Sequence, residues 1–236
     1  MAKLVFDIET VGEDFDSFDE TTKRVLTKWI ERESENEEEY KHYLDDVKNR
    51  TGLSPLTGSV VAIGVLDADR DQGAVYFQAP GEEVKESEDG GIKFQPMDEK
   101  AMLTKFWEIA RQYDEFISFN GRSFDVPFLM LRSAINKVRP SKNLMGNRYL
   151  ERQRDDSLHI DLFDQLNFQG AVHRRDSLHM YTRAFGIDSP KAGGVAGDDV
   201  ASLFKDRKFI DIARYNAGDL KATRDLYRYW HSYLRF

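Results

Sequence analysis

The N-terminal segment Lys3–Thr10 (KLVFDIET) constrains the fold of this chain more than any other feature. Leu4, Phe6 and Ile8 recur at every second position, which predicts a strand from Lys3 to Ile8 with these three side chains facing a core. Asp7 and Glu9 then leave the opposite face of the same strand, side by side. Two buried carboxylates repel each other unless cations compensate them, although a strand end that emerges into solvent would also fit the pattern.

The rest of the chain alternates between strand and helix patterns. The spacing predicts a hairpin of strands over 59–66 and 73–78, and later strands over 115–119 and 158–162. Helices are expected from Asp98 to about Tyr113, from Asp125 onward, and over most of the C-terminal part, with a Gly-rich break at 193–197. The polar, Gly-rich segment 81–96 is expected to be a loop. These alternations predict an α/β fold with a mixed sheet flanked by helices.

Residues 12–57 form an insertion between the first two predicted strands. Its charged part, 21–43, is expected to be helical, with Val25, Trp29 and Ile30 as the few side chains that anchor it. The run of glutamates from Glu31 to Glu39 is typical of a solvated helix face. We therefore expect residues 1–236 to form a single domain that carries this helical insertion at about 12–57.

Composition excludes several classes of protein. The chain has no cysteine, which excludes disulfides, cysteine-bound zinc and thiol nucleophiles. It has neither a signal peptide nor an apolar run of the ~18 residues that span a membrane, so a cytoplasmic protein is expected. The net charge is −8, but residues 122–191 carry 12 basic and 8 acidic side chains, against 12 and 25 in residues 1–100. This asymmetry fits either a phosphate-tolerant face or an excess of solvated glutamate in one insertion.

Two further segments place carboxylates where a core or a turn is expected. Asp219 follows Tyr215 by four positions, so the two share a helix face that is otherwise apolar. A carboxylate there needs a metal or a buried arginine. Asp125, in FNGRSFDVPFL, could be a helix N-cap or a third metal-facing carboxylate at a strand–helix junction. Oxygen-only ligands favour Mg²⁺ or Mn²⁺, and two such ions about 4 Å apart can hydrolyse phosphodiesters.

Together these segments resemble the DEDD exonuclease superfamily in its tyrosine-bearing subgroup. The similarity is greatest to predicted 3′→5′ exonucleases related to the proofreading domain of B-family DNA polymerases. Three motifs occur in the family's order: VFDIET, FNGRSFDVPFL and YNAGDLKATRDLY. The segments HIDLF (159–163) and SLHMYTRAFGI (177–187) extend the resemblance over most of the chain, whereas the insertion at 12–57 has no counterpart that we can name.

The resemblance implies a ribonuclease-H-like fold and a set of residue roles. Two Mg²⁺ or Mn²⁺ ions would be held by four carboxylates, and a tyrosine would orient the attacking water; these five catalytic residues are Asp7, Glu9, Asp125, Asp219 and Tyr215. The terminal nucleotide would contact Thr10, Asn120 and Phe124, although Phe124 could equally belong to the core. The substrate is expected to be a single-stranded nucleic acid, and the related polymerase domain favours DNA over RNA.

Three alternatives remain open at this stage. The chain could be a catalytically idle nucleic-acid-binding module, an adaptor that binds partners through the acidic insertion, or a phosphohydrolase of free nucleotides. The basic segment 137–154 favours a polymeric substrate, and some of its neighbouring arginines are expected to flank the substrate: Arg148, Arg152, Arg154, Arg174 and Arg175. His159, His173 and His179 match no zinc spacing, and Lys191 is either a phosphate contact or a solvated side chain.

Overall fold

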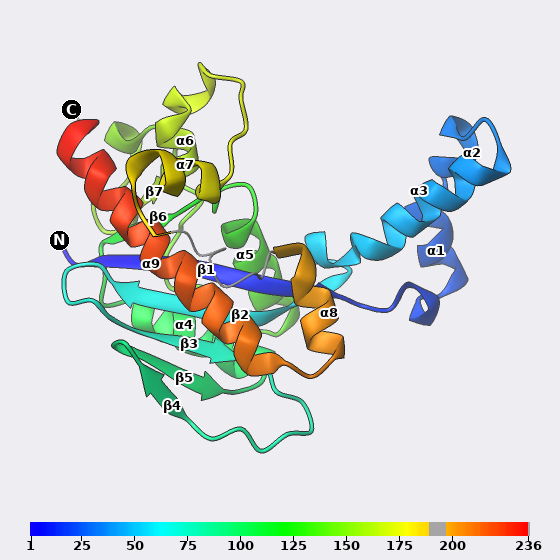
Figure 1. Cartoon of the computed structure of the whole chain (residues 1–236), viewed down its shortest axis with the longest axis horizontal. Helices are drawn as coiled ribbons and strands as arrows, with labels where there is room; N and C mark the ends of the chain where they lie inside the picture. The colour runs from blue at the N-terminus through cyan, green and yellow to red at the C-terminus, as the bar shows by residue number, and fades with distance from the viewer. Residues whose placement is uncertain (189–196, 236) are drawn as a thin grey trace.

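A seven-stranded mixed sheet forms the centre of the protein, with helices on both faces (Figure 1). The computed structural model describes residues 1–188 and 197–235. The strand order is β4-β5-β3-β2-β1-β6-β7. The strands are β1 Lys3–Gly12, β2 Gly58–Asp67, β3 Gln72–Phe77, β4 Ser87–Asp89, β5 Ile92–Pro96, β6 Glu115–Ser118 and β7 Leu158–Asp161.

The helices arise from sequence signals of the expected kind. Asp98 caps α4 by accepting a hydrogen bond from the Ala101 backbone N–H at 2.7 Å, as predicted. The α-helices are α1 Glu20–Thr27, α2 Ile30–Glu33, α3 Glu37–Asn49, α4 Glu99–Ala110, α5 Asp125–Ile135, α6 Leu162–Leu166, α7 Leu178–Phe185, α8 Val200–Lys205 and α9 Phe209–Tyr233.

Strand β1 lies inside the sheet, between β2 and β6, and is longer than expected. It pairs antiparallel with β2 along its whole length, up to the Gly12–Gly58 pair, with a β-bulge between Glu9 and Thr10. Its parallel pairing with β6 covers only Lys3–Val5, because β6 ends at Ser118. Beyond Val5, the edge of β1 on the β6 side is therefore open to other partners.

The alternation along β1 divides its side chains between two cores. Leu4, Phe6 and Ile8 are buried among α4 and α5 on one face, as the sequence predicted. On the other face, Val5 and Val11 contribute to a second core in which α9 is the largest element. Asp7 and Glu9 belong to this second face because they alternate with Phe6 and Ile8.

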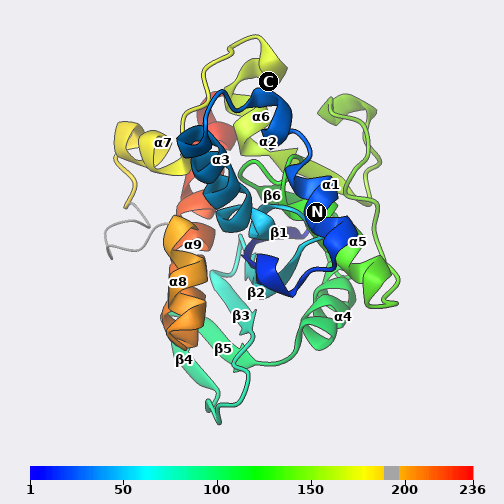
Figure 2. The ribbon, with the colours of Figure 1, turned by 90° about the vertical axis from the view of Figure 1, so that its right-hand side faces the viewer.

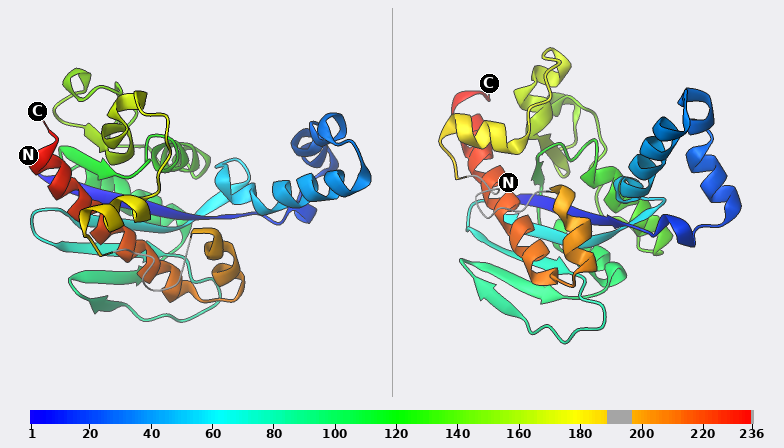
Figure 3. Two further views of the ribbon diagram at one scale, coloured as in Figure 1. Left: turned by 45° about the horizontal axis from the view of Figure 1, so that its top comes forward. Right: turned by 45° about the vertical axis from the view of Figure 1, so that its right-hand side comes forward.

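Helix α9 crosses the sheet over β1, β2 and β3 (Figures 1 and 3). Its buried positions recur at helical spacing, as in Ile212, Asn216 and Leu220, so one face of the helix lies on the strands. Gly64 of β2 permits the close approach: a Cβ at this position would lie 2.0 Å from Asn216 Oδ1. This close packing brings the middle of α9 next to the middle of β1.

The insertion forms a helical arm, residues 13–57, that projects from the end of the sheet where β1 ends and β2 begins (Figures 1 and 2). Its helices α1, α2 and α3 confirm the helical expectation. The expected anchors were partly wrong, because only Ile30 is buried, whereas Val25 is 68% exposed and Trp29 37% exposed. A unit of three helices that projects from the sheet is too small to bury all of its apolar side chains.

The expectation of a loop over 81–96 was wrong for its second half. Residues 92–96 form β5, which pairs parallel with β3, and residues 87–89 form β4 at the sheet edge. Ile92 and Phe94 are buried and alternate with exposed or half-buried residues, which is a strand pattern masked by the polar residues before it. No described helix is long and apolar enough to cross a lipid bilayer.

Candidate active site

Three carboxylates converge between β1 and α9. Oxygen atoms of Asp7, Glu9 and Asp219 all lie within 4.8 Å of one another. Glu9 is buried, and Asp7 and Asp219 are half-buried. The first two side chains come from alternate positions of a strand, and the third comes from the helix that crosses it. The three residues that the sequence analysis took from two distant motifs therefore meet in space.

Asn216, which the sequence analysis did not identify, holds this cluster in place. Its side-chain amide donates a hydrogen bond from Nδ2 to Asp7 Oδ2 at 2.7 Å. Asn216 is fully buried, and its Oδ1 has no hydrogen-bond partner among the described residues. A polar residue among the apolar positions Ile212, Ala213 and Leu220 was a signal in the sequence, because a buried amide needs a specific partner.

The electrostatics of the cluster are those of uncompensated like charges. Burial raises the pKa of Asp7 well above its usual value, and the charges of Asp125, Asp219 and Glu9 raise it further. Burial also raises the pKa of Glu9, with Asp219 and Asp125 as the main charged contributors. The hydrogen bond from Asn216 acts in the opposite direction on both groups. A cation in the cluster would favour the ionised forms that these effects oppose.

Asp125 reaches the same region from the open edge of β1. It is buried at the first position of α5, and its Oδ1 accepts a hydrogen bond from the Ile8 backbone N–H at 3.1 Å. Burial raises the pKa of Asp125 to about 7, against the two backbone N–H groups that bind its ionised form. Asp125 is not the N-cap of α5, as one interpretation of the sequence held, because Phe124 occupies that position. Its carboxylate lies outside the group of three but acts on its charges.

The turn before Asp125 is fixed by Asp161 at the end of β7. The carboxylate of Asp161 accepts hydrogen bonds from the backbone N–H groups of Asn120 at 2.8 Å and Arg122 at 2.9 Å. Asn120 has a φ of 62°, a left-handed conformation that asparagine adopts more readily than most residues. Asp161 therefore supports the turn that precedes Asp125. In the sequence, Asp161 stood out only as part of the matching segment HIDLF.

The three residues expected to contact the substrate differ in their burial and in the contacts that their side chains make. Asn120 is half-buried in its turn. Phe124 is half-buried too, and its ring centroid lies 5.3 Å from that of Phe128, so it contributes to the core beside α5. Thr10 donates its hydroxyl to the Gly52 carbonyl at 2.8 Å. The side-chain hydroxyl of Thr10 is thus engaged by the arm.

Tyr215 lies one helical turn before Asp219 and hydrogen-bonds to its carboxylate. Burial raises the pKa of the Tyr215 phenol far above its usual value, and the charges of Asp219, Glu9 and Asp7 add to this effect. In the metal-free protein the phenol is therefore a neutral hydrogen-bond donor throughout the physiological range. Its hydroxyl is 3.9 Å from the position that a Cβ on Gly197 would take.

The three-carboxylate group has dimensions that suit a small divalent cation. Mg²⁺ binds oxygen at 2.0–2.1 Å, so two ligands on opposite sides of one ion are about 4.2 Å apart. The spread of 4.8 Å within the group is close to that separation. Carboxylate ligands without cysteine or histidine are the donor set of hard cations such as Mg²⁺ and Mn²⁺.

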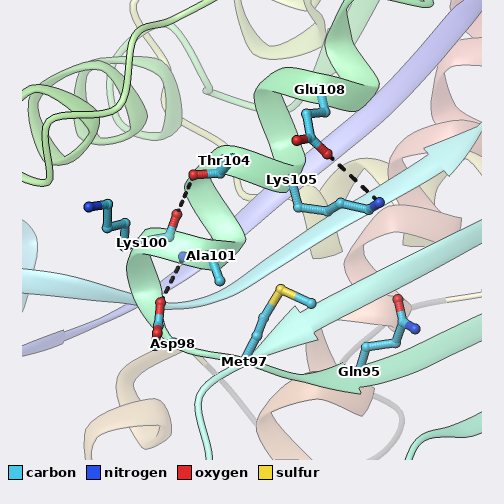
Figure 4. A pocket seen from close by; sticks show the side chains of 8 residues that line it. All are labelled: Gln95, Met97, Asp98, Lys100, Ala101, Thr104, Lys105 and Glu108. Carbon is cyan, nitrogen blue, oxygen red and sulfur yellow. Dashed lines mark hydrogen bonds and ion pairs between the residues drawn. The ribbon is translucent and has the colours of Figure 1, made fainter.

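Two other features do not form a second catalytic centre. His159 is fully buried between Ser118 Oγ at 2.8 Å and the Leu144 carbonyl at 3.0 Å, and burial lowers its pKa to about 3. It is thus a neutral structural residue. A surface pocket of about 560 Å³ lies between α4 and the end of β5 (Figure 4), and the Lys105–Glu108 ion pair borders it. It belongs to the opposite face of the sheet from α9.

The basic residues of the middle segment mostly have local partners. Arg148 makes two hydrogen bonds to Asp164, at 2.7 and 3.0 Å, while Arg154 and Arg174 pair with Asp156 and Asp176. The Arg152 guanidinium lies 5.6 Å from the Tyr149 ring centroid. These exposed pairs leave the positive charge accessible, so a position beside the substrate stays a prediction. Lys191 and most of the Gly-rich break at 193–197 lie outside the described residues.

Comparison with known proteins places the chain in a family. A family described as predicted 3′-5′ exonucleases related to the exonuclease domain of PolB matches residues 57–235. The chain belongs to this family. The matched region contains Asp125, Tyr215 and Asp219, whereas the arm and the strand that carries Asp7 and Glu9 precede it.

Individual relatives extend the similarity beyond the region that the family matches. DNA polymerase 1 of Sulfolobus acidocaldarius is 26% identical over 231 residues, which are 93% of this chain and 26% of the polymerase. The chain thus spans about a quarter of that relative's length. An uncharacterized protein of Methanocaldococcus jannaschii is 28% identical over 188 residues, 78% of this chain and 88% of that protein.

Among solved structures, the family B DNA polymerase of Pyrobaculum calidifontis is similar in fold. It superimposes with a TM-score of 0.58 at 16% identity, covering 98% of this chain and 24% of the polymerase. The mixed sheet flanked by helices is therefore the ribonuclease-H-like fold that the sequence predicted.

Proposed function

We propose that this protein is a metal-dependent 3′→5′ exonuclease that hydrolyses the terminal phosphodiester bond of single-stranded nucleic acid, with DNA preferred over RNA. One observation carries the proposal: Asp7, Glu9 and Asp219 present oxygen atoms within 4.8 Å of one another, beside the buried Asp125. The family match supports the reaction class, and the relation to a polymerase domain supports a polymeric DNA substrate.

The carboxylates would hold two Mg²⁺ or Mn²⁺ ions, which lower the pKa of a bound water and stabilise the leaving oxygen. Asp7 is the central ligand in this proposal, because it feels the charges of all three other carboxylates. Asn216 fixes one of its oxygens, Oδ2, by a hydrogen bond. Asp125, fixed at the Ile8 N–H, adds a ligand from the side of α5.

The remaining residues position the substrate. Tyr215 donates a hydrogen bond in the cluster and would orient the attacking water beside Asp219. The backbone at Thr10 and the side chains of Asn120 and Phe124 would receive the terminal nucleotide. The alternative of a catalytically idle binding module would not need four carboxylates brought to one place, because each costs free energy to bury.

The test is cleavage of a 5′-labelled single strand with Mg²⁺ or Mn²⁺. Stepwise shortening from the 3′ end is expected with the parent protein, and none with Asp7→Ala. The same strand made of RNA measures the preference between the two nucleic acids. No cleavage by the parent protein of DNA, RNA or free nucleotides with either metal would leave the idle module as the better description.

A further inference from the structure

The helical arm carries a surface that the proposed chemistry does not use. From α1 to α2 the chain is almost continuously helical, because Lys28 and Trp29, the two residues between these helices, also have helical dihedral angles. Two adjacent rows at a spacing of four residues are exposed along this stretch, with Glu20 at the start of one row and Glu33 at the end of the other. We call them the basic ridge, and its six residues are Thr21, Arg24, Val25, Lys28, Trp29 and Arg32.

The basic ridge combines positive charge with exposed apolar surface. Arg24, Lys28 and Arg32 form one row, and among the described residues no carboxylate lies within ion-pair distance of them. Other cations of the arm are paired, such as Lys41 with Glu37 and Arg50 with Asp46. The three cations of the ridge are therefore available to a ligand, although the arm as a whole is acidic.

The second row supplies exposed apolar side chains. Val25 is 68% exposed and Trp29 37% exposed. The Trp29 ring is held by Tyr43 of α3, with ring centroids 5.3 Å apart. A fixed aromatic ring next to a row of cations is the combination that binds single-stranded nucleic acid, by stacking on bases and by neutralising phosphates.

The base of the arm is packed against the end of the strand that carries Asp7 and Glu9. Thr10, next to Glu9, donates its hydroxyl to the Gly52 carbonyl of the arm. A Cβ on Gly12 would lie 1.9 Å from Thr51 Oγ1, so the two crossing segments are in close contact. The arm is thus attached firmly to the strand that carries Asp7 and Glu9, and its α3, of 13 residues, reaches about 20 Å from this base.

We propose that the basic ridge is a second binding surface for the nucleic-acid strand whose 3′ end enters the carboxylate cluster. This inference rests on the proposed function for the identity of the ligand. The arm would contact the part of the nucleic-acid strand that continues beyond the carboxylate cluster. The ridge would therefore contribute to the binding of long nucleic-acid strands and not of short ones. The arm precedes the region matched by the family, so the ridge is a property of this chain and not of the family match.

The test is a comparison of two double variants that remove the same charge from the arm. Arg24→Gln/Lys28→Gln removes two cations of the ridge, and Lys41→Gln/Arg50→Gln removes two that are already paired elsewhere on it. Binding is measured by fluorescence anisotropy in EDTA, without cleavage, with labelled single strands of about 4 and about 20 nucleotides, the range that such binding sites span.

The ridge variant should bind the long strand about tenfold more weakly, and its salt slope should fall by about 1.4, because each phosphate contact on a single strand contributes about 0.7. The control variant should keep the parent's affinity and slope. Trp29→Ala should weaken long-strand binding about tenfold, and Trp29→Phe, which keeps an aromatic ring, should weaken it less. The affinity for the short strand should change less than twofold in each case.

Equal long-strand affinity and salt slope for parent and ridge variant would overturn the inference. So would an equal loss in the control variant, which would show a general effect of charge. A change of oligomeric state in the ridge variant, with strand binding intact, would assign the ridge to a protein contact instead. These outcomes are independent of the proposed catalysis, because a protein can lose the ridge's contribution and still cleave, or bind through the ridge and never cleave.

Discussion

Asn216 Nδ2 lies 2.7 Å from Asp7 Oδ2, and this hydrogen bond joins the crossing helix α9 to the strand that carries two of the three clustered carboxylates. The amide sets the direction of the Asp7 side chain from the side opposite to solvent. It can do so only because Gly64 leaves room for it on β2. Helix packing and the geometry of the proposed metal site are therefore coupled through a single side chain.

Asn216→Ala should weaken metal binding without removing any carboxylate. Loss of a group that orients a metal ligand typically reduces metal affinity by about 10- to 100-fold. Titration with Mn²⁺ followed by electron paramagnetic resonance measures this directly. Gly64→Ala should act in the same direction, because its Cβ would displace the Asn216 amide, whereas Gly146→Ala has no neighbour closer than 4.0 Å and serves as the control. Parent-like Mn²⁺ affinity in Asn216→Ala would leave the amide a packing residue only.

Asp7→Asn should abolish cleavage and stabilise the metal-free protein at neutral pH. The substitution removes the group on which the charges of three other carboxylates act, so their repulsion falls. The expected result is a higher melting temperature than the parent's in EDTA and a lower one in saturating Mg²⁺, because the variant can no longer gain stability by binding the metal. A variant that melts below the parent in EDTA would point to a structural role for the carboxylate.

Asp125 should make the metal-free protein less stable as the pH rises. Its pKa in the folded protein is about 7, above the ordinary 3.8, so the folded state holds the proton more tightly than the unfolded state does. Its contribution is complete below about pH 4 and is lost as the pH rises to about 7. The melting temperature in EDTA, measured at a series of pH values across this range, should fall more steeply with pH for the parent than for Asp125→Asn. Parallel curves would show that Asp125 ionises without cost.

Tyr215→Phe should slow the chemical step and spare the metals. The phenol is a neutral donor beside Asp219, so its removal takes away the orientation of the attacking water and leaves the ligands in place. A positioned catalytic group contributes about 10²-fold or more, which sets the expected loss in single-turnover rate at saturating Mn²⁺. Mn²⁺ affinity and strand affinity should match the parent's. An unchanged rate would make Tyr215 a packed aromatic residue of α9.

Charge reversal at Arg174 and Arg175 should weaken the binding of single strands. Arg174 is paired with Asp176 at 3.3 Å, but its side chain is 77% exposed, and such surface pairs are too weak to prevent phosphate contact. Arg174→Glu/Arg175→Glu should lower the affinity and flatten its dependence on salt, with Mn²⁺ binding unaffected. The same affinity and salt slope as the parent's would place these arginines away from the strand.

The sequence predicted the parts of this fold that depend on local pattern. The alternation of Leu4, Phe6 and Ile8 gave the central strand and its buried face, and Asp98 gave the start of α4. The strand β5 escaped prediction because its pairing with β3 is parallel and bridges a polar, Gly-rich segment. Long-range pairing of this kind has no local signature, since it depends on a strand edge supplied by another part of the chain.

The residues of the candidate site also fall into those that local sequence patterns predict and those that depend on long-range packing. Asp7, Glu9, Asp219 and Tyr215 could be named from motifs, because their spacing within a strand or a helix is local. The function of Asn216 depends on the crossing of α9 over β1 and β2, and that of Asp161 on the adjacency of β6 and β7. The exposure of Trp29 could not be predicted either, because it depends on which side of the α1–α2 segment faces α3.

Gly12 and Gly58 are partners in the last pair of the β1–β2 ladder, so the whole arm stands where an antiparallel hairpin would need only a two-residue turn. The sheet register is complete before the arm begins, and no strand depends on the arm's length. Insertion, exchange or loss of the arm during evolution would therefore leave the two-stranded frame of Asp7 and Glu9 intact. An Asn-Gly turn between the two glycines would join β1 to β2 in the same register, so the connection can be shortened without moving the strand that carries Asp7 and Glu9.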